Sequence, residues 1–427
     1  MIDGKYMYSL AEELWPIPRS LSGPGVRQTL SILKRELSGL KLGRYRTGDR
    51  AFDWTIPKEW SVKSARLVDP HGRVICDFEE NNLSLVGYSV PVNGKFSLEY
   101  LQNHLYSLEN QPNAIPFVTS YYQENWGFCL THQSRQALID GMYDVRIDSE
   151  LKNGYLDYGE LVVRGKSSRE VLFSTYVCHP SMANNELSGP VLSTALALKL
   201  KELDLNYTYR FLFLPETVGS LAYLAQNHNY MRQKMLAGFV VTCVGDEGQF
   251  SYIPSRLGGT LADRLALKVL NDMALEYVEY QWSDRGSDER QYCAPGIDLP
   301  VCSVTRSKYG EYPEYHTSLD RLGTVVTPVG LQGSLDYFLG VVLEIERSRF
   351  PKTTVRGEPQ LGARGLYAQT SVYRGSEHEG KALRDSLSMF DGNHTLEEVA
   401  ARMKLDVEEV ERLLVVAKEH GLAAEGG

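Results

Sequence analysis

Two histidines and one glutamate stand where segments of this sequence that resemble buried strands give way to polar loops. His179 and Glu216 each end an apolar run, and His316 lies in the polar segment 314–320. Such side chains could bind a metal ion or move a proton. A glutamate at the end of a buried strand is costly to bury without a partner. A single histidine at such a place is more often structural, so these residues suggest chemistry only when they are considered together.

The loop after His179 is polar and leads into a helix of small residues. Loops after the carboxyl ends of strands form the crevice of an open α/β sheet, so we expect His179 and Glu186 at such a crevice. Each polar residue also has a plainer interpretation. Glu186 could cap the helix that follows, and Asp288 could bond to its own turn. Asp320 could orient His316 or begin the next helix.

Strands and helices alternate from about residue 155 to residue 347, which favours an α/β fold with helices on both faces of a sheet. We expect strands at 161–163, 171–175, 209–214 and 239–244, and helices at 191–203, 221–231, 261–273 and 329–347.

Other segments flank this alternating region. Residues 6–38 favour helices around a Pro/Gly-rich break at 15–23. Residues 52–150 favour short strands, with a hairpin at 65–76. Residues 351–380 are polar and predict a linker or a loosely packed connection. Residues 381–424 have the helix–turn–helix pattern of a winged helix, and Thr395 opens one of its helices with a Thr/Glu pair typical of a capping box.

The charge of the C-terminal module opposes DNA binding. Residues 381–427 hold six basic and ten acidic side chains, a net charge of −4. The expected recognition helix begins with four carboxylates within 406–411, which would face DNA phosphates. We therefore expect a packing or dimerisation module and no nucleic-acid partner.

The composition narrows the class of protein. The 427 residues include 45 Lys and Arg against 54 Asp and Glu, a net charge of −9, and 43% are hydrophobic. These values are ordinary for a globular protein. No apolar run approaches the roughly 18 residues of a membrane span, we expect no secretory signal, and the six cysteines form no CxxC pair. We expect a cytoplasmic protein with reduced thiols and no membrane partner.

Taken in order, the motifs resemble those of the zinc-dependent aminopeptidases of the co-catalytic exopeptidase class. That family has a strand-end His, an Asp in an Ala-Asn-Asp-Asn-Ala-Ser-Gly-type loop, a Glu-Glu-x-Gly strand end, a later Asp, and Ser-Asp-His and Tyr-His-Thr segments. The matching segments here are 174–190, 211–220, 286–297 and 314–320.

The sequence is similar in more detail to a bacterial subgroup that has an inserted β-rich domain and a C-terminal winged helix. The shared motifs are Cys-His-Pro-Ser-x-Ala-Asn-Asn/Asp-x-Leu-Ser-Gly and Pro-Glu-Thr-x-Gly-Ser, and the similarity extends to 18–23 near the start. The resemblance implies an α/β fold with a three-layer aminopeptidase-like core and a mixed central sheet.

The resemblance also implies roles for single residues. His179 takes the place of the first metal-binding histidine, His316 of the last, and Glu216 of the general base. The other positions depart from the pattern: Asn185 stands for the bridging aspartate, Thr217 for the second glutamate, Thr242 or Cys243 for the later aspartate, and Ser181 for the aspartate that usually orients the first histidine.

A two-zinc site would lose most of its carboxylates through these departures. We expect one zinc ion per chain, held by His179, His316 and Glu186, because catalytic zinc needs about three protein ligands. Bound zinc would activate a water molecule, and Glu216 would carry its proton to the leaving amine. A two-metal site built from other ligands and a metal-free relic are the alternatives.

Three residues are candidates for binding the substrate. Arg19 could hold a carboxylate, because the guanidinium fork matches one well. Tyr315 could donate to an oxyanion, and Asp288 could accept a free amine. Asn185 and Asp320 are expected to support the ligands from behind. Each of these residues could also be purely structural.

The sequence thus predicts three domains and a reaction. The aminopeptidase-like core comprises 1–50 and 151–350, the inserted β-rich domain 51–150, and the linker with the winged helix 351–427. The expected reaction is amide hydrolysis, most simply release of an N-terminal aminoacyl group from a peptide or small biosynthetic intermediate. The alternatives are a zinc amide or ester hydrolase, such as a deacylase, on a natural-product or sugar intermediate, and an inactive peptidase-fold binding protein. A homodimer is plausible through the helical module.

Overall fold

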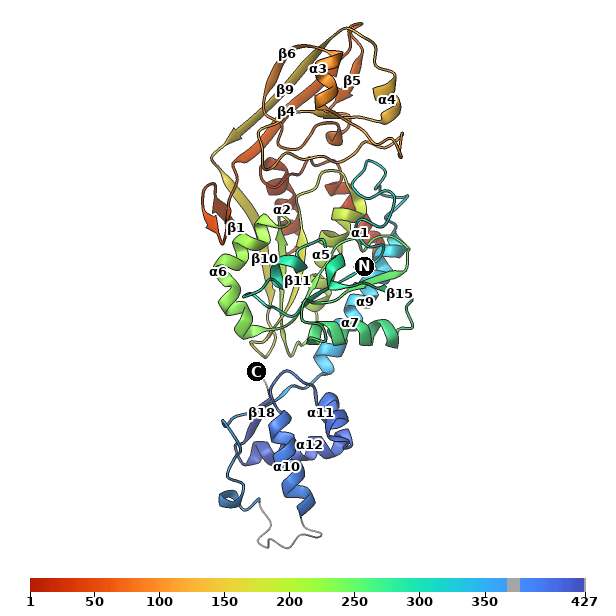
Figure 1. Cartoon of the computed structure of the whole chain (residues 1–427). Helices are drawn as coiled ribbons and strands as arrows, with labels where there is room; N and C mark the ends of the chain where they lie inside the picture. The colour runs from red at the N-terminus through yellow and green to blue at the C-terminus, as the bar shows by residue number, and fades with distance from the viewer. Residues whose placement is uncertain (367–376, 426–427) are drawn as a thin grey trace. The chain divides into compact units, whose positions relative to one another are not determined.

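The computed structural model describes residues 1–366 and 377–425, and the chain divides into two compact units (Figure 1). Unit 1 comprises Met1–Val163, Val171–Asp204 and Tyr209–Gly340. Unit 2 comprises Arg164–Glu170, Leu205–Thr208 and Val341–Gly427.

An eight-stranded mixed sheet forms the centre of the core and confirms the expected fold class. The strand order is β1-β10-β12-β11-β13-β16-β14-β15. The bounds are β1 (Lys41–Arg46), β10 (Tyr155–Val163), β12 (Thr208–Leu214), β11 (Glu170–Tyr176), β13 (Met235–Val240), β16 (Val301–Thr305), β14 (Phe250–Ile253) and β15 (Tyr277–Glu279). The pairs β1–β10, β10–β12 and β14–β16 are antiparallel, whereas β13–β16 and β14–β15 are parallel.

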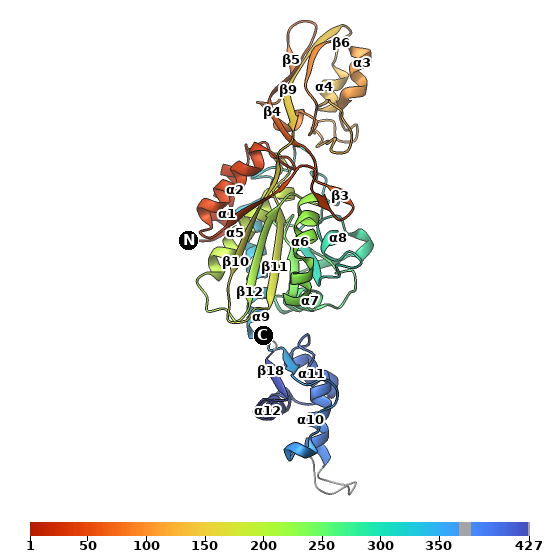
Figure 2. The ribbon, with the colours of Figure 1, turned by 90° about the vertical axis from the view of Figure 1, so that its left-hand side faces the viewer.

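Helices cover both faces of this sheet. They are α1 (Gly4–Leu14), α2 (Pro24–Glu36), α5 (Ser188–Leu200), α6 (Val218–Lys234), α7 (Leu261–Asp272), α8 (Glu289–Tyr292) and α9 (Pro328–Arg347). Figure 2 shows α1, α2 and α5 on one side of the sheet and α6 and α8 on the other. Successive side chains of a strand point to opposite faces. Accordingly, Leu172 packs in one cluster with Leu224 of α6, whereas the Phe173 ring contacts Phe338 of α9.

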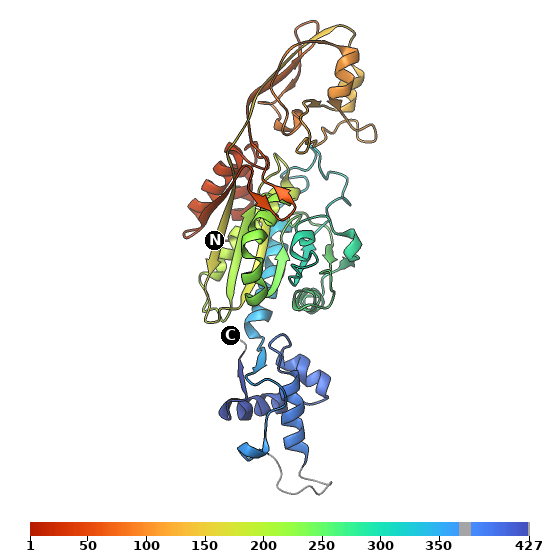
Figure 3. The ribbon, with the colours of Figure 1, turned by 60° about the vertical axis from the view of Figure 1, so that its left-hand side comes forward.

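The inserted domain is built on a separate four-stranded antiparallel sheet with the order β5-β4-β9-β6. Its strands are β4 (Glu59–Val68), β5 (Val74–Asp77), β6 (Val92–Ser97) and β9 (Met142–Lys152), and Figure 3 shows β4 and β9 linking it to the core. The expected hairpin at 65–76 is confirmed, because β4 and β5 pair around the turn at 69–73. The smaller elements are β2 (Arg50–Ala51), β3 (Trp54–Thr55), α3 (Leu98–Leu101), β7 (Leu105–Tyr106), β8 (Phe128–Cys129) and α4 (His132–Gln136).

Unit 2 contains the winged helix. Its helices are α10 (Glu377–Met389), α11 (Leu396–Met403) and α12 (Val407–Glu419), and β17 (Pro351–Thr353) pairs antiparallel with β18 (Ala423–Glu425). The expected linker at 351–380 is therefore wrong for its first residues, since β17 and the buried Leu361 belong to this unit's packing. The partner strand of β17 is β18, which lies about seventy residues further along the chain. Local composition gives no indication of that pairing. Residues 367–376 of the expected linker lie outside the described residues.

One predicted strand is displaced. The strand expected at 239–244 is β13 and ends at Val240, because Cys243 takes a positive φ of 50° and turns the chain away from the sheet. Among the described residues no helix is both long and apolar enough to cross a membrane.

Candidate active site

Four loops next to the central strands each hold a non-glycine residue with positive φ. The residues are Ser181 (36°) after β11, Thr217 (63°) after β12, Cys243 (50°) after β13 and His316 (54°) between β16 and α9. A residue of this kind held in the left-handed region costs of the order of 1–3 kcal/mol, and such residues gather at functional sites. Five other non-glycine residues of the described chain also have positive φ, so strained turns are present in the loops that carry the predicted site residues but are not confined to them.

The imidazole of His179 connects two carboxylates. Its Nδ1 lies 3.2 Å from Oε2 of Glu186, and its Nε2 lies 3.9 Å from Oε2 of Glu216. The backbone places the ring there because β11 ends at Tyr176 and the next residues run directly into the loop. His179 and Glu216 therefore meet, as the sequence predicts.

Glu216 has a carboxyl group that is 20% exposed and could exchange a proton. Its Oε1 accepts a hydrogen bond from the Ser287 hydroxyl at 2.8 Å, and its backbone N–H donates to Cys178 Sγ at 3.3 Å. Burial raises the pKa of Glu216, an effect that the nearby His179 and the bond from Ser287 partly oppose. A raised pKa suits a group that must both take and return a proton.

His316 lies beside His179, and one of its ring nitrogens, Nε2, makes no hydrogen bond within the described part of the chain. The centroids of the two rings are 5.4 Å apart, and the His316 ring stacks on Tyr315 at 3.9 Å. Its Nε2 is buried and has no hydrogen-bond partner among the described residues. Burial, with a smaller contribution from His179, lowers the pKa of His316 to about 3, so the ring is neutral at physiological pH.

Phe117 of the inserted domain packs against both histidines, which the sequence did not suggest. Its ring centroid lies 5.2 Å from that of His179 and 5.2 Å from that of His316. The Phe117 N–H also donates to the His316 carbonyl at 2.8 Å. The residues near Phe117 in the sequence do not indicate a role at the site. Its position depends on contact between the inserted domain and the His316 loop, about 200 residues later in the chain.

Glu186 and Arg19 form a buried ion pair. Arg19 Nε lies 2.7 Å from Glu186 Oε1, and neither side chain is exposed to solvent. Glu186 Oε2 accepts the backbone N–H groups of Cys178 and His179. These contacts occupy the carboxylate expected to bind zinc. They also enclose the guanidinium expected to bind substrate, which a substrate could reach only by displacing Glu186.

Asn185 and Asp320, which were expected to support the ligands, make their hydrogen bonds to groups other than the two histidines. Asp320 accepts the backbone N–H of Asn184 at 2.8 Å and that of Asn185 at 3.0 Å, so it holds this turn rather than the His316 ring. Burial raises the pKa of Asp320 to about 6. The side-chain oxygen Oδ1 of Asn185 accepts a hydrogen bond from the Tyr176 hydroxyl. The same hydroxyl lies 2.5 Å from the hydroxyl oxygen of Thr242.

Asp288 and Tyr315 also lie at the site. Asp288 Oδ1 accepts the Thr217 N–H and the Ser220 hydroxyl, both at 2.8 Å, while its Oδ2 is buried with no bonding partner in the described chain. Tyr315 covers the face of His316.

The donor atoms can be tested against a metal ion. Cys178, His179 and Glu186 bring ligand-type atoms together. That group fits poorly, because Arg19 already neutralises Glu186 and burial raises the pKa of the Cys178 thiol, which disfavours a thiolate. The histidine pair fits better, since neutral imidazole is a common metal ligand and His316 Nε2 is buried and available.

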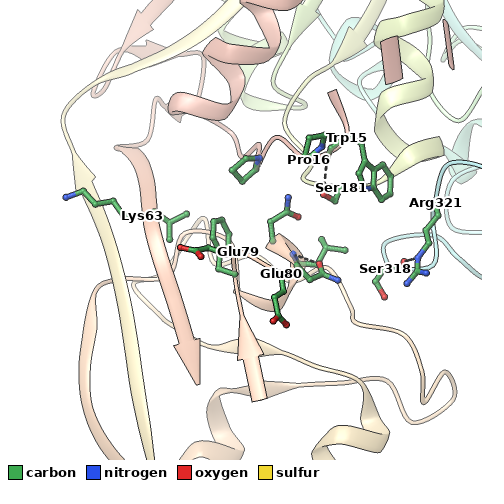
Figure 4. Close-up of a pocket in the computed structure, with 14 residues that line it drawn as sticks. Trp15, Pro16, Lys63, Glu79, Glu80, Ser181, Ser318 and Arg321 are labelled. Atoms are coloured by element: carbon green, nitrogen blue, oxygen red, sulfur yellow. Dashed lines mark hydrogen bonds between the residues drawn. The ribbon is translucent and has the colours of Figure 1, made fainter. Parts of the chain in front are cut away.

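A cavity of about 610 Å³ adjoins the site between the inserted domain and the core. Figure 4 shows Ser181, Ser318 and Arg321 from the core and Glu79 and Glu80 from the inserted domain around it. Ser181 and Ser318 each follow a site histidine by two residues. The volume falls in the usual range for small-molecule sites.

Comparisons with known proteins agree with this architecture. A family model described as a domain of unknown function (DUF4910) matches residues 8–348, and a winged helix-turn-helix model matches residues 349–425. A protein of Clostridium acetobutylicum, assigned provisionally to polysaccharide biosynthesis and described as having an aminopeptidase-like domain, is 41% identical over 404 residues. The match spans 94% of this chain and 92% of that protein.

Solved structures show the same fold. A crystal structure of a provisionally assigned peptidase from Clostridium acetobutylicum has 39% identity and a TM-score of 0.80, and the match covers 99% of this chain and 96% of that one. BSAP, a zinc aminopeptidase from Bacillus subtilis, has 14% identity and a TM-score of 0.60, with 81% and 95% covered. At that identity BSAP supports the fold alone. The chain belongs to the DUF4910 family and has an aminopeptidase-like fold with a C-terminal winged helix.

Proposed function

We propose that this protein is a hydrolase that cleaves an amide bond at the site formed by His179, Glu216 and His316. The observation that carries the proposal is the juxtaposition of these three side chains. His179 Nε2 faces the Glu216 carboxylate at 3.9 Å, and the adjacent, neutral His316 has a buried Nε2 with no bonding partner in the described part of the chain. A structural histidine would normally satisfy that atom.

His179 and His316 are the residues that would hold one zinc ion. When bound, zinc polarises a carbonyl group and makes water more acidic. Glu216 Oε2 would accept a proton from the attacking water and return it to the leaving nitrogen. Ser287, which donates to Glu216 Oε1, would keep the other oxygen facing the histidines.

The substrate would be an aminoacyl or acyl amide carried by a small biosynthetic intermediate. The description of the Clostridium relative, which names polysaccharide biosynthesis, supports a saccharide-linked amide. The cavity lined by Ser181 and Ser318, each two residues from one of the histidines in the chain, has room for such a group. Release of an N-terminal aminoacyl group and removal of an acyl group are the two forms of this reaction to be compared.

Metal content and turnover test the proposal. Elemental analysis of the purified chain should find about one zinc, lost in His179→Ala and His316→Ala and retained in Glu216→Gln. His228→Ala is the matched control, because His228 is a half-buried histidine on α6. Aminoacyl p-nitroanilides and N-acetyl hexosamines serve as substrates, and Glu216→Gln should abolish hydrolysis. Zinc retained in both histidine variants would reject the proposed ligands.

A second candidate function is ligand binding on a peptidase fold without catalysis. Asn185, Thr217 and either Thr242 or Cys243 stand where the resemblance expects carboxylate ligands. The Thr217 hydroxyl instead accepts a hydrogen bond from Arg290 at 3.1 Å. A chain that takes up no zinc when supplied with it, and hydrolyses none of these amides, would favour this second function.

A further inference from the structure

We infer that Arg19 and Glu186 together form a positioning device for His179, which holds its imidazole with Nδ1 protonated and Nε2 directed toward Glu216. The inference rests on the proposed function, because it concerns how that site is prepared. It assigns to both residues a role different from ligand or substrate binding.

The contacts of Glu186 define the orientation of the ring. Oε2 lies 3.2 Å from His179 Nδ1 and also accepts the N–H groups of Cys178, at 2.5 Å, and of His179 itself. An ionised carboxylate only accepts hydrogen bonds, so its contact with Nδ1 favours a neutral ring with the proton on that nitrogen. Cys178 Sγ, a weak donor, lies farther from Nδ1, at 3.4 Å. The lone pair of Nε2 is then left facing Glu216, as metal-binding histidines require.

Arg19 makes the buried charge of Glu186 tolerable. Its Nε donates to Glu186 Oε1 at 2.7 Å and to the His179 carbonyl at 2.9 Å, and its Nη1 donates to the Leu14 carbonyl at 2.6 Å. Burial lowers the pKa of Arg19, while the charge of Glu186 opposes that shift. The guanidinium thus joins the end of α1, the backbone of His179 and the carboxylate that holds the ring.

Glu186 replaces a partner that the sequence lacks. In the family that this chain resembles, the aspartate two residues after the first histidine orients that histidine, and here the position is Ser181. The Ser181 hydroxyl is already committed, because it donates to the Trp15 carbonyl at 3.1 Å. The carboxylate instead comes from the next turn of the loop, and Arg19, in the motif at 18–23, is the counter-charge that this arrangement needs.

The tautomer of His179 in the zinc-free protein tests this directly. Selective ¹⁵N-histidine labelling and ¹⁵N–¹H correlation spectra distinguish Nδ1–H from Nε2–H, and His179→Gln identifies the His179 signals among the nine histidines. The wild type should show Nδ1–H. Glu186→Leu should shift the ring toward Nε2–H, because a leucine side chain offers no oxygen to accept the Nδ1 proton. Zinc affinity should fall about 10–100-fold, as expected when a hydrogen-bond partner of a metal-binding histidine is removed.

Two further variants separate positioning from stability. The double variant Arg19→Met/Glu186→Leu removes both charges and avoids an unpaired buried ion, so it keeps the test usable if Glu186→Leu alone does not fold. It should fold and still lose the Nδ1–H signal. Arg19→Lys keeps the charge and should retain that signal. Glu160→Gln breaks the ion pair of Glu160 with Arg210 between β10 and β12 and should leave the His179 signal unchanged.

The outcomes are distinguishable from failure of the proposed function. A wild-type ring with Nε2–H, or an unchanged Nδ1–H signal in both Glu186→Leu and the double variant, would overturn the inference even if the protein hydrolyses amides. Loss of the Nδ1–H signal in these variants would support it even if every amide tested is left intact, because the spectra require neither zinc nor substrate.

Discussion

At the scale of single residues, the carboxyl group of Asp288 is buried with only half of its hydrogen-bonding capacity used. Two donors reach Oδ1, while Oδ2 is buried and meets no donor among the residues that the structure describes. Burial, with a smaller contribution from the charge of Glu216, raises the pKa of Asp288 to about 7. Folding therefore favours the protonated carboxyl group over a range where an unfolded aspartate is ionised.

This predicts a pH dependence of stability that Asp288→Asn should remove. Because the folded pKa is raised, the contribution of Asp288 is complete below its ordinary value of 3.8 and is lost as the pH rises toward 7. The rise of the Asp288 pKa from 3.8 to about 7 corresponds to at most about 4 kcal/mol of free energy of unfolding. Urea unfolding between pH 4 and pH 8 should show the wild type losing free energy of unfolding relative to Asp288→Asn.

Asp298→Asn is a suitable comparison for that measurement. Asp298 is partly exposed, and its pKa is lowered by its hydrogen bond with Arg256, so its removal should change stability in the opposite direction with pH. Equal pH slopes for wild type and Asp288→Asn would contradict the prediction.

At the scale of elements, the segment of the inserted domain around Phe117 is attached to the His316 loop. Ile115 N–H donates to the Ser318 hydroxyl at 3.0 Å, and Ser318 N–H returns a bond to the Ile115 carbonyl at 2.9 Å. These bonds, together with that from Phe117 to His316, hold the Phe117 ring against both histidines. The inserted domain thus forms one wall of the site.

Phe117→Ala should therefore expose the histidine pair. Diethyl pyrocarbonate acylates neutral imidazole, and mass spectrometry should show severalfold faster modification of His179 and His316 in the variant. The half-buried ring should also contribute about 2 kcal/mol to stability. Tyr122→Ala is the control, because Tyr122 is 75% exposed and makes no ring contact with either histidine among the described contacts. Unchanged modification rates would show that Phe117 does not cover the pair.

A second prediction at this scale concerns the start of α11. The Thr395 hydroxyl accepts the Glu398 N–H at 3.2 Å, and the Glu398 carboxylate accepts the Thr395 N–H at 2.9 Å, which is the capping box that the sequence predicts. Thr395→Ala should destabilise the winged helix by about 1 kcal/mol. Thermal unfolding followed by circular dichroism measures this, and Ser388→Ala, at the exposed end of α10, should have a smaller effect.

At the scale of the whole molecule, the charge of the chain bears on its partners. The net charge is −9 for the chain and −4 for residues 381–427. Within unit 2, basic groups such as Arg349 and Lys418 are paired with Glu411 or Glu425 rather than left to meet phosphates. This supports our prediction that the winged helix serves packing or self-association.

Fluorescence anisotropy with a mixed-sequence DNA duplex tests that prediction. At 50 mM salt, where electrostatic binding is strong, we expect no saturable binding at micromolar protein, since specific binders need clustered positive charge. Sedimentation of the same samples reports whether the chain is a dimer. Tight binding that weakens steeply with salt would instead indicate a DNA-binding role.

Much of the fold could be predicted because it depends on local patterns. The alternation of strands and helices, the hairpin at 65–76 and the capping box at Thr395 follow from side-chain periodicity and turn chemistry, and the structure confirms them. The displaced strand after Val240 and the pairing of β17 with β18 could not be predicted in this way. One depends on a strained backbone at Cys243, and the other on residues about seventy positions apart.

By itself, the sequence determined which residues could do chemistry. His179 and Glu216 are identified by residue type and by their places at the ends of expected strands, and His316 by its place in a polar loop. Only the tertiary structure decided how those residues are used. Arg19 meets Glu186 across 167 positions and Asp320 meets Asn185 across 135. A buried charge must find its partner wherever the fold brings one, and that choice is made by three-dimensional packing rather than by neighbours in the chain.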